Sequence, residues 1–109
     1  METIARNKLH INVTAIKDTV TLYLQGHFSF DAYREFKSAY GEPLKNPSIN
    51  AVTINLSEVE YLDSSALGML LVLRDQAQLA NKSLTLSRPS TYAMRTFEIA
   101  SFEKIFSIL

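Results

Sequence analysis

Residues 51–73 read AVTINLSEVEYLDSSALGMLLVL, and this stretch decides the fold. Its first six residues are mostly apolar, which predicts a buried strand near the centre of a sheet. From Ser64 onward, apolar residues recur at the spacing of a helix that continues to about Ala80. Asp63 precedes this helix and is placed to cap it. A buried strand followed at once by an amphipathic helix predicts an α/β domain.

Two further strands are predicted before this stretch. Apolar residues alternate from Leu9 to Ala15, which indicates a strand with one buried face, and they alternate again over residues 19–25. The Lys17-Asp18 turn lies between them, so we expect the two strands to pair as a hairpin. Gly26 is expected to end the second strand.

A first helix is predicted between the hairpin and the buried strand. Ser29 is expected to be its N-cap, Asp31 adds negative charge to its first turn, and the helix should end near Tyr40. Residues 41–50 contain glycine, two prolines and two asparagines, which predicts a loop. The core face of the helix is expected to consist of Tyr33, Phe36 and Tyr40.

The remaining residues complete the α/β pattern. We expect a short strand at 83–87, a helix at 91–100 and a last strand at 104–109. The order is therefore β-β-α-β-α-β-α-β, which predicts a mostly parallel, mixed sheet of four to five strands with helices packed on it. A chain of 109 residues has room for one hydrophobic core, so residues 1–109 are expected to form one domain.

Composition argues against several classes of function. Eleven Lys and Arg residues balance eleven Asp and Glu residues, whereas nucleic-acid binding requires an excess of positive charge. Without cysteine, disulfides and thiol chemistry are excluded. The apolar run 66–73 is far shorter than the roughly 20 residues of a membrane span, and METIARNKLH has no signal-peptide core. We expect a cytoplasmic protein without membrane insertion.

No catalytic, metal or cofactor motif is found in the sequence. Ser64 and Ser65 are not surrounded by a G-x-S-x-G elbow, and both phosphate-binding glycine motifs are absent. His10 and His27 lie in the predicted hairpin and are expected to be solvated surface side chains. We therefore expect neither enzymatic activity nor a cofactor. Three nearby carboxylates are expected to be solvated acids rather than ligands of a divalent cation: Glu58, Glu60 and Asp63.

The start of the helix at Ser64 is locally acidic. Between Lys45 and Arg74 there is no Lys or Arg, so a partner of this region should be basic or at least not acidic. Leu67 and Leu71 lie opposite the core face of the same helix. Either they pack against a neighbouring helix, or they form an exposed apolar patch beside Ser64 that suits protein docking.

The segment YLDSSALG at residues 61–68 resembles the phosphorylation-site motif of STAS domains, the fold of bacterial anti-sigma factor antagonists. The resemblance extends along nearly the whole chain and implies the STAS fold. It also implies that Ser64 is phosphorylated by an anti-sigma factor with serine kinase activity and restored by a metal-dependent serine phosphatase. The expected partner-binding residues are Ser29, Asp31, Leu62, Asp63, Ser65, Leu67, Gly68 and Leu71.

The sequence departs from the family pattern at two points. Many family members carry an aspartate within a few residues of the glycine that precedes the first helix. Here His27, Phe28 and Ser29 occupy that place, and Asp31 follows two residues later. Ala66 replaces the glycine that commonly follows the double serine, a change that favours the helix.

Two functions follow from the resemblance. In the first, the protein is an anti-sigma factor antagonist that controls transcription, or another effector, by partner switching. A phosphate on Ser64 would add roughly −1.5 to −2 charge to an acidic surface and release the partner. In the second, the chain is a non-catalytic subunit of an ABC-type lipid or anion transport complex and Ser64 stays unmodified. A hydrolase that uses Ser64 is disfavoured because no base accompanies it.

Overall fold

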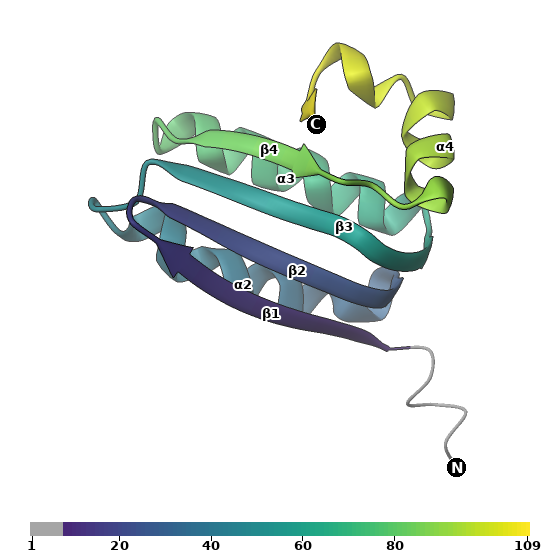
Figure 1. Ribbon diagram of the computed structural model, residues 1–109, viewed down its shortest axis with the longest axis horizontal. Coiled ribbons are helices and arrows are strands. Elements are labelled where there is room, and N and C mark those ends of the chain that lie inside the picture. The colour runs from purple at the N-terminus through teal and green to yellow at the C-terminus, as the bar shows by residue number, and fades with distance from the viewer. Residues whose placement is uncertain (1–7) are drawn as a thin grey trace.

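A computed structural model of the protein describes residues 8–109 and contains a five-stranded mixed sheet covered by helices on one face (Figure 1). The expectation about a signal peptide falls mainly on residues 1–7, outside the described residues. Within residues 8–109, no helix has the length and apolar character needed to cross a membrane. The elements are β1 (Leu9–Ile16), β2 (Thr19–Phe28), the 3-10 helix η1 (Phe30–Ala32), α2 (Tyr33–Lys45), β3 (Ala51–Leu62), α3 (Ser64–Leu79), β4 (Ser83–Ser87), α4 (Thr91–Ile99), the 3-10 helix η2 (Phe102–Lys104) and β5 (Ser107–Ile108).

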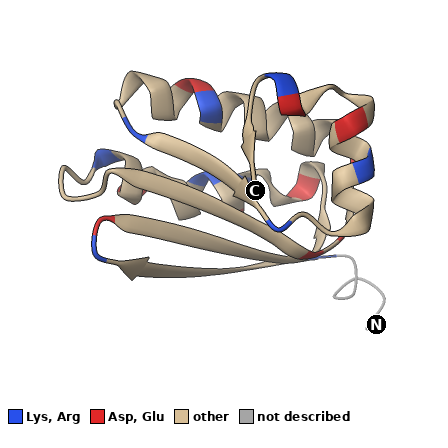
Figure 2. Cartoon of the chain, turned by 45° about the horizontal axis from the view of Figure 1, so that its top comes forward, with Lys and Arg blue, Asp and Glu red and all other residues tan. Residues whose placement is uncertain are grey.

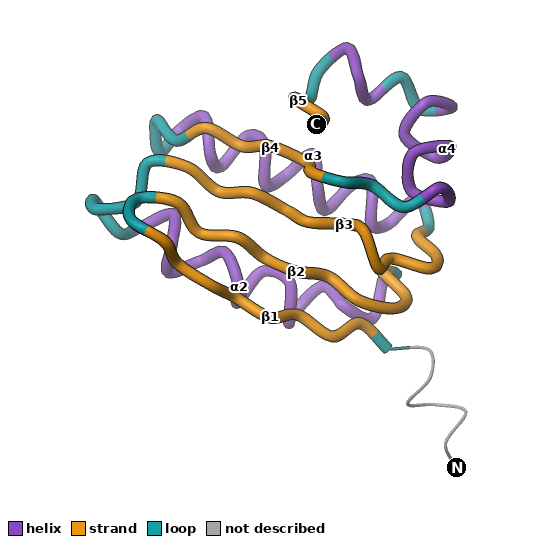
Figure 3. Tube along the Cα trace, in the orientation of Figure 1, coloured by secondary structure: helices purple, strands orange, loops and turns teal. Residues whose placement is uncertain are grey.

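The strands lie side by side in the order β1-β2-β3-β4-β5, so β3 is the central strand, as predicted. β1 and β2 form the predicted antiparallel hairpin, and the other three pairs are parallel. Strands and helices alternate after β2, and α2 and α3 lie behind the sheet (Figure 3). The predicted α/β class and mostly parallel sheet are confirmed.

The core lies between the sheet and the helices. Alternate side chains of β2 and β3 point toward α2 and α3, and these side chains are almost completely buried. Removing each such side chain from water contributes about 1.5–3 kcal/mol, which fixes the register of the central strands. The buried side chains of these two strands include Val20, Leu22, Leu24, Val52, Ile54 and Leu56.

The opposite face of the sheet is polar and almost free of charge. Charged residues gather on the helices and near the strand ends in Figure 2. One row of hydroxyls crosses four strands, because the register places these residues side by side: Thr14, Thr21, Thr53 and Thr85. Cross-strand threonine pairs stabilise a sheet modestly.

The first helix differs from the prediction at both ends. Its α-helical part begins at Tyr33, and Ser29 is no side-chain cap: its hydroxyl donates a hydrogen bond to Asp31 Oδ1 at 2.9 Å. Tyr33 is 53% exposed and lies outside the core, unlike Phe36 and Tyr40. The predicted loop is also wrong at its start, because α2 continues through residues 41–45. Pro43 lies in the last turn, where it removes a single backbone hydrogen bond and its own side chain is buried.

Three strands differ from their predicted extents. β2 continues past Gly26 to Phe28, and β3 reaches Leu62, so Ser57, Glu58 and Glu60 lie within a strand and Val59 between them is buried. The predicted buried face of β1 is wrong: Leu9 and Ile11 are only half-buried, and Val13 is exposed, since β1 lies at the margin of the helical layer. The last strand contains only Ser107–Ile108, because residues 102–104 form a 3-10 turn.

Candidate functional site

The candidate site lies where β2 and β3 end. The carboxyl ends of parallel strands meet at one edge of the sheet, and ligands of open α/β sheets commonly bind there. Phe28 pairs with Leu62, and the backbone N–H of Asp63 donates to the Phe28 carbonyl at 3.3 Å. Ser29 and Asp63, the residues that follow these two strands, are therefore brought together although 34 positions separate them.

Asp63 caps α3, as the sequence predicts. Its Oδ1 accepts a hydrogen bond from the Ala66 backbone N–H at 3.0 Å, which satisfies one of the free donors at the start of the helix. Ser64 and Ser65 are the first two residues of α3, and both side chains are exposed. Within residues 8–109, neither serine hydroxyl takes part in a side-chain hydrogen bond. The Ser64 hydroxyl is therefore free to react or to bind another molecule.

The start of α3 has the features that favour an anion at the N-terminus of a helix. The N–H groups at the start of a helix have no partner within it, and the helix dipole is positive there. A phosphoryl group on Ser64 would face this end of α3 while Asp63 continues to cap it. The added charge would therefore alter the surface of the molecule rather than its core.

One face of α3 continues the exposed surface beyond Ser64. At about 100° per residue, Gly68 and Leu71 lie within about 40° of Ser64 around the helix. Leu71 is 37% exposed and belongs to the exposed apolar surface, which was one of the two alternatives for these leucines. Leu67 is half-buried and packs against the core, which was the other. A methyl group added at Gly68 would meet no atom within 4 Å. The fold itself thus does not require a glycine at this position.

Leu62 was predicted to contact a partner, but the structure buries it. Its side chain is only 2% exposed and belongs to the core, because it lies on the helix-facing side of β3. We therefore leave Leu62 out of the Ser64 surface, and Leu67 as well, because Leu67 packs against the core. This name is used below for the exposed or half-exposed residues at the start of α3 and at the end of β2: Ser29, Phe30, Asp31, Asp63, Ser64, Ser65, Gly68 and Leu71.

Aromatic residues near this end of the sheet were not predicted as part of the site. Phe30 is 72% exposed, directly between Ser29 and Asp31. The Tyr61 ring lies 5.6 Å from that of Tyr92 on α4, and 5.5 Å from the His27 ring. Two of them could have been found from the sequence: Phe30 lies between two predicted contact residues, and Tyr61 is the first residue of the YLDSSALG segment. The tyrosines come from separate elements that only the fold brings together.

The histidines and acids also have defined places. His10 is exposed as expected, but His27 is half-buried, with Nε2 3.7 Å from Glu60 Oε1. Glu58 and Glu60 are exposed on β3, and Asp63 is engaged as the helix cap. Among residues 8–109, no three His, Cys, Asp or Glu side chains are arranged to hold a metal ion.

Two comparisons by sequence identify related proteins. Residues 11–109 match the family model described as Mlab, STAS domain. The STAS-domain containing protein PA14_20770 of Pseudomonas aeruginosa (strain UCBPP-PA14) is 38% identical over 89 residues, which cover 82% of this chain and 86% of that protein.

Solved structures share the same fold. An anti-sigma factor antagonist from Mycobacterium paratuberculosis has a TM-score of 0.81 at 18% identity, covering 94% of this chain and 86% of that one. The unphosphorylated anti-sigma factor antagonist SpoIIAA has a TM-score of 0.75 at 15% identity, covering 94% and 88%. SLC26A9 has a TM-score of 0.68 at 11% identity, covering 84% of this chain but only 17% of that one. With residues 11–109 matched by the family model, this chain belongs to the STAS domain family.

Proposed function

We propose that the protein is an anti-sigma factor antagonist that switches partners through Ser64. The observation that carries this proposal is an exposed serine hydroxyl at the start of α3, next to a capping aspartate, in a STAS fold. With Ser64 free, the Ser64 surface binds an anti-sigma factor that is also a serine kinase, and the sigma factor is set free. The chain itself catalyses nothing in this scheme.

The kinase would transfer the γ-phosphoryl group of its bound ATP to Ser64 Oγ. ADP leaves, and the hydroxyl proton passes to a base on the kinase. A metal-dependent serine phosphatase then hydrolyses the new ester, which returns the hydroxyl and releases inorganic phosphate. Each step leaves the backbone of α3 in place, because the helix N-terminus tolerates the anion.

Release of the partner follows from charge and bulk. The phosphate adds roughly −1.5 to −2 charge beside Asp63. The segment that carries Ser64 contributes no positive charge of its own, since no Lys or Arg occurs between Lys45 and Arg74. A partner that fits closely around a neutral hydroxyl would meet both repulsion and a desolvation penalty. Asp31 supplies a second contact, because Ser29 Oγ holds its carboxylate in place.

The experiment combines phosphosite mapping with exchange of Ser64. Intact mass of the protein from its native host should show one phosphate, located on Ser64. The Ser64→Ala variant should keep its affinity for the kinase partner. The Ser64→Asp variant should bind the same partner at least about tenfold more weakly. Ser48→Asp is the matched control, because it adds the same charge at an exposed serine near the opposite end of β3, and it should bind like the unchanged protein. Absence of phosphate under every growth condition, with equal binding by both Ser64 variants, would contradict partner switching.

A structural role in a larger assembly is the second candidate. The matched region amounts to only 17% of SLC26A9, so this fold also occurs as one part of a much larger protein. In that case the chain is a non-catalytic subunit of a membrane transport complex of the lipid or anion class. Ser64→Ala and Ser64→Asp should then retain the same membrane subunits, which distinguishes the two candidates in one co-purification.

Gly68 provides an independent test of the Ser64 surface. Glycine within a helix lowers stability by about 0.5–1 kcal/mol relative to alanine, and no atom obstructs a side chain here. Gly68→Ala should therefore raise the free energy of unfolding by about that amount in urea titrations, and yet weaken partner binding. Gly41→Ala in α2 is the matched control, with the same stabilisation and unchanged binding. Full partner affinity in Gly68→Ala would remove Gly68 from the contact surface.

A further inference from the structure

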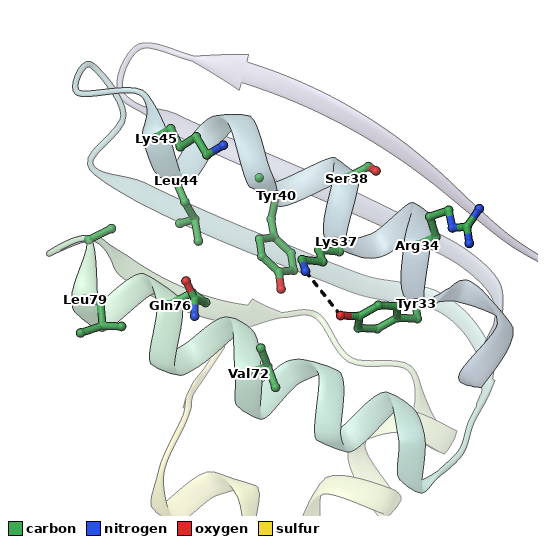
Figure 4. Close-up of a pocket in the computed structure, with 12 residues that line it drawn as sticks. Tyr33, Arg34, Lys37, Ser38, Tyr40, Leu44, Lys45, Val72, Gln76 and Leu79 are labelled. Atoms are coloured by element: carbon green, nitrogen blue, oxygen red, sulfur yellow. Dashed lines mark hydrogen bonds between the residues drawn. The ribbon is translucent and has the colours of Figure 1, made fainter.

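A groove of about 790 Å³ runs between α2 and α3 (Figure 4). Its lining shares no residue with the Ser64 surface. Tyr40 and Leu44 of α2 line it opposite Val72 and Leu79 of α3. Val72 is 49% exposed and Leu79 is 79% exposed, so apolar side chains remain uncovered along this groove.

The groove is also positively charged. Arg34, Lys37 and Lys45 line it, and no acidic residue does. At about 100° per residue, these three cations fall within roughly 80° around α2. Glu35 and Glu42 lie about 80–100° around the helix from Arg34 and do not line the groove. Every basic side chain of α2 therefore lies at the groove, and both acidic side chains lie outside its lining.

None of these cations is neutralised within the described chain. The ion pairs among residues 8–109 are His27 with Glu60 and Arg74 with Asp75, and neither involves the groove. Lys37 Nζ instead donates to the Tyr33 hydroxyl at 3.5 Å, and lies 5.7 Å from the centre of that ring. Burial raises the pKa of Tyr40, so its hydroxyl stays protonated and adds no negative charge. The groove therefore presents positive charge over an apolar surface.

The length of the groove indicates the shape of its occupant. Tyr33 and Lys45 both line it, and twelve residue steps of α-helix separate them by about 18 Å. Gly41 lies between them, and a methyl group there would meet no atom within 4 Å. The backbone of α2 is thus open to close approach in the middle of the groove.

We propose that this groove binds an amphipathic helix of a partner protein, about three turns long, with an apolar stripe and an acidic flank. The stripe covers Val72, Leu44 and Leu79, and the acidic flank lies along the cations of α2. This is the helix-in-groove mode of recognition, with charge setting the orientation. The site is separate from the Ser64 surface, so it holds its partner whether or not Ser64 is modified. The proposal goes beyond the proposed function and does not depend on it.

Two synthetic peptides test the proposal against the purified chain. One has about 14 residues, with leucines at i, i+3, i+4 and i+7 and glutamates along one flank of the helix. The other carries lysine at every glutamate position. Fluorescence anisotropy should show saturable binding of the glutamate peptide and at least about tenfold weaker binding of the lysine peptide. Backbone amide chemical shifts should change at residues 33–45 and 72–80, and not at Ser64.

Two kinds of variant locate the binding. Arg34→Glu, Lys37→Glu and Lys45→Glu together should reverse the preference between the peptides. The same change of charge outside the groove should leave the preference intact, as in Lys8→Glu, Arg95→Glu and Lys104→Glu together. Gly41→Leu should abolish binding by filling the groove while circular dichroism stays unchanged, since leucine favours a helix. This variant tests the site even if the triple reversal fails to fold.

Several results would overturn the proposal. Equal binding of both peptides, or binding of neither, would show that the cations of α2 do not select an acidic helix. Shift changes confined to the Ser64 surface would place the peptide elsewhere. Binding of dodecanoate without binding of either peptide would make a small amphiphile the occupant, and self-association that Gly41→Leu abolishes would make a second copy of the chain the occupant. None of these outcomes alters the expectation for Ser64.

Discussion

Replacing Phe28 with alanine should lower the free energy of unfolding by about 3–5 kcal/mol. The ring is completely buried and lies 4.9 Å from that of Phe36, so β2 and α2 both lose packing when it is removed. Domains of this kind are stable by only about 5–15 kcal/mol, so the change is a large fraction of the total. Urea titration followed by circular dichroism measures it.

The loss should also reach the Ser64 surface. The Phe28 carbonyl accepts the hydrogen bond from Asp63 N–H, and Asp63 in turn caps α3. Phe28→Leu is the control, because it retains most of the buried volume and should cost about 1–2 kcal/mol. A loss below about 1 kcal/mol in the alanine variant would mean that the core closes around the gap.

Gly26→Ala should destabilise the protein by about 2–4 kcal/mol. The backbone φ of Gly26 is +105°, which L side chains rarely adopt. A Cβ atom there would lie 2.5 Å from the Lys8 carbonyl oxygen, a backbone atom that also accepts a hydrogen bond from His27 N–H. Neither the strain nor the overlap can be relieved without moving β1 away from β2.

The sign of this effect distinguishes it from the other glycine exchanges. Gly41→Ala and Gly68→Ala replace the same residue type in open helical positions and should both stabilise the protein. Melting temperatures of the three variants, measured side by side, separate the two cases. An unchanged melting temperature for Gly26→Ala would show that the hairpin adjusts to the extra methyl group.

Patterns carried by buried side chains predicted the fold well. The apolar alternation of the hairpin and the spacing of apolar residues in α3 follow from which faces meet the core. Ends of elements were harder to predict. Gly41 and Pro43 are typical of loops, but α2 extends over both of them because Tyr40 and Pro43 are buried against the core. The polar residues Ser57, Glu58 and Glu60 concealed the second half of β3, although Val59 among them is buried, because packing outweighs local preference.

The site was predictable only in part. Asp63 as cap and Ser64 as an exposed residue follow from positions along one segment of the chain. The approach of Tyr61 to Tyr92 depends on how α4 packs against β3, which no local pattern specifies. The groove was missed because the predicted first helix ended near Tyr40, before Lys45 could join the other two cations on one face.

The outer edge of β1 bears on the behaviour of the protein at high concentration. Among residues 8–109, β1 pairs only with β2, so one side of its backbone has hydrogen-bonding groups without a strand partner. Natural edge strands are usually protected by proline, lysine or an inward-pointing charge. The sequence LHINVTAI contains none of these, and Val13 and Ile16 are exposed on it. We therefore expect β1 to be the edge through which two folded molecules pair when the protein is concentrated.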